Sequence, residues 1–127
     1  MVNIKEKQDT IDLRKKLSIE LCNNFVKRLD PLQDKETKLG ALIAIKNLIK
    51  ESHIYDPFLF SYLVDTLIDP DKEIRDMVIR VIKDVGVEPS VYPEIIELLE
   101  IKLQEANSET KNEIKNLLQF LKSTINQ

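Results

Sequence analysis

Apolar side chains recur along the chain at spacings of three and four residues, which is the period of one face of an α-helix. This pattern predicts six helices separated by short polar segments. Their expected ranges are about 10–29, 34–51, 57–68, 72–85, 92–105 and 109–124. We therefore predict an all-α fold, in which a single domain spans residues 9–127 and the polar residues 1–8 form a flexible N-terminal tail.

The helical pattern also repeats along the chain, as it does in repeat proteins. Residues 34–38 (DKETK) are similar to residues 71–75 (DKEIR), 37 positions later, and residues 109–111 (ETK) follow residues 73–75 (EIR) by 36 positions. Apolar residues align behind each of these starts. They are Ala41, Ala44, Ile45 and Leu48; then Val78, Val81, Ile82 and Val85; and finally Ile114, Leu117, Leu118 and Leu121. The period divides the chain into three helix pairs, at about 10–51, 56–86 and 90–125.

Capping residues support these helix boundaries, since Asp and Ser side chains accept hydrogen bonds from the first free backbone N–H groups of a helix. The expected N-terminal caps are Asp34, Asp56, Asp71 and Ser108. For the last helix, a capping box formed by Thr110 and Glu113 is the alternative. Gly86 follows the last apolar position of its helix, so we expect it to be the C-terminal cap.

The middle pair carries a motif of its own. Residues 69–75 (DPDKEIR), followed by the apolar positions of the helix from residue 78, resemble a HEAT repeat. The resemblance implies a right-handed α-solenoid of three antiparallel helix pairs. It also implies a ladder between neighbouring repeats, formed by an acidic residue in the turn and a basic residue six positions later. The matching pairs are Asp69 with Arg75 and, as a variant, Glu105 with Lys111; in the first pair Lys38 is present, but Leu32 stands at the acidic position.

Solenoids of stacked hairpins bind partners through extended concave surfaces, which here would be formed by the second helix of each pair. On a helical wheel, the positions opposite the core form what we call the second-helix row. Its members are Leu39, Ile43, Lys46, Asp76, Arg80 and Lys83, with Asn112, Asn116 and Gln119 at the corresponding positions of the last pair. The first of these helices is apolar almost all round, because Leu42 adds to Leu39 and Ile43. Such a helix is either buried under the first helix and the tail or provides a groove for an amphipathic partner helix.

An aromatic pair is the second candidate contact. Phe58 and Tyr62 are four residues apart, on the side of their helix opposite the expected core residues Phe60, Leu63 and Leu67. Exposed aromatic side chains are enriched at protein interfaces. The alternative is that the pair packs against the neighbouring hairpin.

Composition narrows the classes of function. The chain has 127 residues, of which 43% are hydrophobic and 32% charged, with a formal net charge of −3. No apolar run approaches the roughly 18 residues that span a membrane, and the acidic balance argues against a nucleic-acid partner. Charge is uneven, with +3 over residues 1–29 and −3 over each of 30–86 and 87–127. Head-to-tail association of two copies is therefore an alternative to a solvated surface.

An enzymatic role has little support in the residues. The chain has one histidine, His53, and one cysteine, Cys22, so it cannot form a Cys/His zinc site, and no nucleophile is recognisably paired with His53. We expect no metal and no cofactor, and the lone cysteine fits a reducing cytoplasm. The sequence thus predicts a non-catalytic, cytoplasmic protein-protein interaction module that binds another protein or a peptide. The alternatives are a nucleic-acid-associated accessory protein and, third, a HEAT-like enzyme or lyase subunit.

Overall fold

The computed structural model describes residues 13, 16–17, 20–21, 23–30, 32–52, 57–85, 88–89 and 91–125. Within these ranges the protein is all-helical and has no strand, as the predicted all-α class requires. The elements are α2 (Lys35–Ser52), α3 (Pro57–Asp65), the 3-10 helix η1 (Thr66–Ile68), α4 (Lys72–Val85), α5 (Tyr92–Glu105) and α6 (Ser108–Ile125). Each α-helix in this set begins within one residue of the predicted start. Before α2, residues 23–27 are helical and residues 28–30 turn away, and we call residues 23–30 the N-terminal segment.

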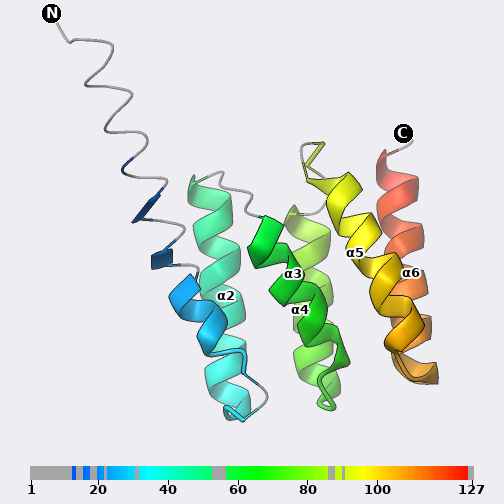
Figure 1. The fold of residues 1–127 in the computed structure, drawn as a ribbon, viewed down its shortest axis with the longest axis horizontal. Coiled ribbons are helices and arrows are strands. Elements are labelled where there is room, and N and C mark those ends of the chain that lie inside the picture. Colours follow the sequence, from blue (N-terminus) through cyan, green and yellow to red (C-terminus); the bar gives the residue numbers. More distant parts are fainter. Residues whose placement is uncertain are drawn as a thin grey trace, which may run out of the picture.

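The helices lie in two layers (Figure 1). One layer contains α2, α4 and α6, and the contacts α2 with α4 and α4 with α6 run through it. The other contains α3 and α5, which pack against each other, with the helical residues before α2 beside α3. The second helices of the three pairs, α2, α4 and α6, therefore lie next to one another. The first helices α3 and α5 do the same in the other layer.

The predicted apolar stripes face a core shared by both layers. Leu42, Ile45, Leu63, Val78 and Ile114 are completely buried. The same core extends to α5 and to the N-terminal segment through Ile95, Leu99, Val26 and Leu29. The core residues of each helix recur at spacings of three and four, so the apolar period of the sequence predicts most of the buried positions. Ala44 and Leu48 deviate slightly, since both are only half-buried.

Helix capping agrees with the prediction at two helix starts and corrects it at a third. An Oδ1 atom of Asp34 accepts a hydrogen bond from the Thr37 N–H at 2.7 Å, and Asp71 Oδ1 accepts one from the Glu73 N–H at 2.9 Å. At the start of α6, the cap is Asn107, whose Oδ1 accepts from the Thr110 N–H at 2.9 Å. The prediction of Ser108 as the cap was wrong, because Ser108 is already the first helical residue.

The capping box was wrong as well, since Glu113 binds Arg75 of the preceding hairpin. Three further predictions lie outside the described residues: the tail at residues 1–8, Asp56 as a cap and Gly86 as a C-terminal cap. The chain leaves α3 through η1, where the Thr66 hydroxyl donates to the Tyr62 carbonyl at 2.8 Å. This tighter turn directs residues 66–70 toward the pocket described below.

Candidate functional site

The second-helix row is continuous across three helices. Lys46 Nζ on α2 lies 3.1 Å from Asp84 Oδ2 on α4, which joins the first two helices on this face. Lys83 Nζ on α4 lies 4.7 Å from the centroid of the Phe120 ring on α6, which joins the next two. The structure therefore brings residues that are far apart in sequence onto one surface.

The side chains of this row, and of Leu42 beside it, differ in how far they are exposed to solvent. Ile43 is 47% exposed, whereas Leu42 is completely buried and Leu39 is half-buried against the core. Leu42 is thus part of the core, whereas Ile43 is not buried. Arg80 is exposed, and within the described ranges it pairs with no carboxylate. Asp76, in contrast, is held by Lys72 one turn earlier on the same helix, at 3.3 Å.

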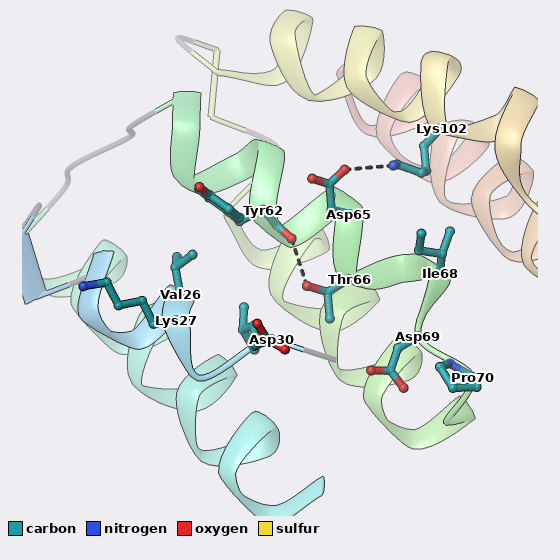
Figure 2. Close-up of a pocket in the computed structure, with 11 residues that line it drawn as sticks. Val26, Lys27, Asp30, Tyr62, Asp65, Thr66, Ile68, Asp69, Pro70 and Lys102 are labelled. Atoms are coloured by element: carbon teal, nitrogen blue, oxygen red, sulfur yellow. Dashed lines mark hydrogen bonds and ion pairs between the residues drawn. The ribbon is translucent and has the colours of Figure 1, made fainter. Parts of the chain in front are cut away.

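A pocket of about 660 Å³ lies in the other layer, between the N-terminal segment and the end of α3 (Figure 2). Its lining comes from three places in the sequence. The residues are Val26, Lys27, Leu29 and Asp30; Tyr62, Asp65, Thr66, Ile68, Asp69 and Pro70; and Lys102. We call it the α3 pocket. It was not predicted, because its walls come from segments whose relative position the sequence pattern does not define.

The predicted aromatic pair is partly represented in this pocket. Tyr62 is 50% exposed and lines its wall. The side chain of Phe58 lies outside the described residues. Phe60 is buried in the core, as the stripe predicted.

Ion pairs determine the charge of the α3 pocket. Lys102 Nζ, on a side chain only 12% exposed, lies 2.8 Å from Asp65 Oδ1 and 3.1 Å from Glu105 Oε2. Burial lowers the pKa of Lys102, but the hydrogen bonds to Asp65 and Glu105 outweigh it, so the pKa is raised above its usual value. This ammonium therefore stays charged and is shared by two carboxylates. The charge of Asp69 is balanced by a residue outside the pocket, since Asp69 Oδ2 accepts a hydrogen bond from Lys38 Nζ at 2.7 Å.

No protein-family model, curated protein or solved structure matches the chain. In the part of the chain that the structure describes, no helix has the length and apolar character to cross a membrane. Over the same residues, no group of three His, Cys, Asp or Glu side chains is arranged to hold a metal ion. His53 and Cys22 lie outside the described residues.

Asp69 and Arg75, two residues of the predicted ladder, each bind a residue of a neighbouring hairpin. The Asp69 carboxylate binds Lys38 of the preceding hairpin, and both side chains are under 10% exposed. Arg75 Nη1 donates to the backbone carbonyl of Asp69 at 2.9 Å, and its Nε lies 3.0 Å from Glu113 Oε1 on α6. Glu105 binds Lys102, three residues earlier on α5, and Lys111 is half-buried.

The sequence did carry a signal for these contacts. Lys38, Arg75 and Lys111 occupy equivalent positions in the three helix pairs. The first two of these basic side chains reach forward to an acidic residue of the next hairpin, Asp69 or Glu113. Asp69 follows Lys38 by 31 positions and Glu113 follows Arg75 by 38, so equivalent basic residues bind acidic residues at non-equivalent positions of the next hairpin.

Proposed function

We propose that the protein is a cytoplasmic HEAT-like α-solenoid of three hairpins that acts as a non-catalytic protein-interaction module. Two features support the solenoid interpretation. The helices pack in order within each layer, and buried basic residues on α2 and α4 bind acidic groups of the next hairpin. A repeated unit whose contacts are with its neighbours is the defining property of this architecture.

The second-helix row is the proposed contact surface. The observation that carries this proposal is the exposure of Ile43 and Arg80 on adjacent helices that Lys46 and Asp84 join. An exposed aliphatic side chain beside an arginine is a combination that interfaces use, since arginine contributes strongly to binding and apolar contacts exclude water around it. The complementary partner is an amphipathic helix or extended peptide that presents an apolar residue to Ile43 and a carboxylate to Arg80.

Affinity capture with matched variants tests this function. The immobilised wild-type protein, Ile43→Asp, Arg80→Glu and Ile101→Asp are each exposed to extract of the native cell, and bound proteins are quantified by mass spectrometry. Ile101 is the control, because it is 53% exposed but lies on α5 in the other layer. Circular dichroism establishes that each variant is folded.

We expect proteins that the wild type and Ile101→Asp both retain, and that Ile43→Asp and Arg80→Glu lose. Retention of the same proteins by both row variants would show that the second-helix row is not the contact surface. If all three variants lost the captured proteins equally, the cause would be a loss of fold or a surface that includes Ile101. That result would also contradict the proposal.

A further inference from the structure

The α3 pocket has the size and the lining of a binding site. Its volume of about 660 Å³ lies within the usual range of ligand pockets, roughly 300–1,000 Å³. Val26 and Leu29 form a buried apolar floor, and Tyr62 and Ile68 are each about half exposed at its wall. An aliphatic group entering the pocket would therefore lose contact with water on several sides.

Three exposed charged side chains line the pocket, the acidic Asp30 and Asp65 and the basic Lys27. Asp30 is exposed, and the Asp65 side chain is 56% exposed although it binds Lys102. Lys102 does not reverse this balance, because Asp65 and Glu105 share its single ammonium group. Figure 2 shows Lys27 with its amino group directed away from Asp30 and Asp65.

Two helix C-terminal ends border the pocket. The N-terminal segment leaves its helix through turns in which the Arg28 and Leu29 N–H groups bond to the carbonyls of Phe25 and Val26. The 3-10 helix η1 also ends here, with the Asp69 N–H bonded to the Thr66 carbonyl at 3.1 Å. Helix C-termini carry a partial negative charge and favour cations. Both ends contribute lining residues, so the pocket combines apolar walls with a preference for positive charge.

We propose that the α3 pocket binds a basic side chain, above all an arginine, that lies next to an aliphatic residue in a segment of a partner protein. The guanidinium group bonds to Asp30 and Asp65 and stacks on the Tyr62 ring, while the aliphatic neighbour packs on Val26, Leu29 and Ile68. Guanidinium groups suit such a site because they combine planar hydrogen bonding with stacking on aromatic faces. This pocket lies in the layer opposite the second-helix row, so its occupation does not rest on the function proposed above.

Three matched peptides test the proposal: acetyl-Leu-Arg-Leu-amide, the same peptide with citrulline in place of arginine, and the same peptide with glutamate. Citrulline keeps the shape of arginine but lacks its charge. Each peptide is titrated into the ¹⁵N-labelled full chain, and backbone amide shifts are followed by NMR. We expect the arginine peptide to shift amides of residues 26–30 and 62–70 and to bind about tenfold more tightly than the citrulline peptide.

Substitutions inside and outside the α3 pocket show whether the arginine peptide binds there or elsewhere on the surface. Tyr62→Ala and Asp65→Asn are each expected to weaken binding of the arginine peptide several-fold, whereas Ile43→Ala, in the second-helix row, leaves it unchanged. Equal binding of the arginine and glutamate peptides would overturn the proposal, as would shifts confined to the second-helix row or no shifts for any peptide at millimolar concentration. Loss of capture by Ile43→Asp, by contrast, reports only on the second-helix row.

Discussion

Arg75 shows how a single side chain connects two hairpins. Its side chain is 6% exposed, and its Nη1 donates to the carbonyls of Asp69 and Pro70 at 2.9 and 3.0 Å. The opposite edge of the guanidinium reaches Glu109 and Glu113 on α6. One planar group thus binds the turn of its own hairpin and the helix of the next. A buried charge is tolerated here because its donors have partners.

We predict that Arg75→Lys lowers the free energy of unfolding by about 1–3 kcal/mol, because an ammonium cannot make this fork of hydrogen bonds. Arg80→Lys is the matched control, since Arg80 is exposed, and its effect is expected to stay within about 0.5 kcal/mol. Urea unfolding followed by circular dichroism measures both. Equal effects for the two substitutions would contradict the role assigned to Arg75.

Asp34 makes stability depend on pH. The Thr37 backbone N–H, and then the Thr37 side chain, hold the pKa of Asp34 below its usual value of 3.8. A carboxyl group whose pKa is lower in the folded state than in the unfolded state stabilises the fold above the unfolded pKa. This contribution is lost as the pH falls through the folded pKa.

Asp34→Asn removes the titration but keeps a good capping residue. We therefore expect the stability of the wild type relative to this variant to be constant above about pH 6 and to decline as the pH falls below about 4. Urea unfolding across this range measures the difference. A difference that stays constant down to the lowest pH would show that the Asp34 charge does not contribute.

At the level of elements, helix starts depend on one or two local residues. Sequence and structure agree at α2 and α4, where Asp34 and Asp71 cap. They disagree at α6, where two adjacent residues, Asn107 and Ser108, are both good capping residues. Only the position at which the backbone enters the helix decides between them. In the structure Ala106 and Thr110 are buried on either side of this start, and local preferences do not report such burial.

The assignment of the α6 cap leads to a direct test. Asn107→Ala is expected to lower the free energy of unfolding by about 1 kcal/mol, because the Thr110 N–H loses its acceptor. Ser108→Ala is the neighbouring control and is expected to change stability by less than about 0.5 kcal/mol. Thermal and urea unfolding of the two variants give the comparison. The reverse order would restore Ser108 as the cap.

The end of α3 is a second difference at this level. The sequence predicts a helix to residue 68, and the structure has an α-helix to Asp65 followed by η1. A hydrophobic stripe does not distinguish an α-turn from a 3-10 turn over three residues, because both keep Leu63 and Leu67 on the buried side. The difference matters for the site, since η1 supplies Thr66 and Ile68 to the α3 pocket.

For the whole molecule, stability is expected to depend on all three hairpins. α5 covers α3, and α6 covers α4 and satisfies Arg75. A chain that ends at residue 87 therefore exposes one side of both α3 and α4 and leaves a buried guanidinium without its acidic partners. Repeats that bury their apolar faces only against neighbours need about three copies to be stable.

We predict that this shortened chain loses cooperative unfolding. Circular dichroism and urea titration are expected to show lower helix content per residue and a broad transition at lower urea than in the full chain. The full chain under identical conditions is the control. A sharp transition at the same urea concentration would show that the first two hairpins are independently stable, and the contacts with α5 and α6 dispensable.

The uneven charge along the chain favours head-to-tail association of two copies as an alternative. Such association would use the surfaces at the two ends of the molecule. Among the described residues at the start of the chain, Leu13, Leu17 and Leu21 are about half exposed. At the other end α6 exposes Asn112, Lys115 and Gln119, with Leu118 only 7% exposed. α6 also exposes part of Phe120, whose ring lies 4.7 Å from Lys83 Nζ, so its surface mixes polar and aromatic side chains. Light scattering across protein concentration and salt tests association through these two ends.

The sequence by itself determined the all-α class, the starts of α2 to α6 to within a residue and most residues of the core. Each of these depends on neighbours three or four positions apart, and a periodic pattern records such short-range relations directly. The tertiary structure decided the contacts between segments: Lys38 with Asp69, Arg75 with Glu113, and the meeting of residues 26–30 with α3 and Lys102 at the α3 pocket. These depend on how helices from different hairpins pack, which is set by the fit of side chains across the core and not by the order of residues within any one helix.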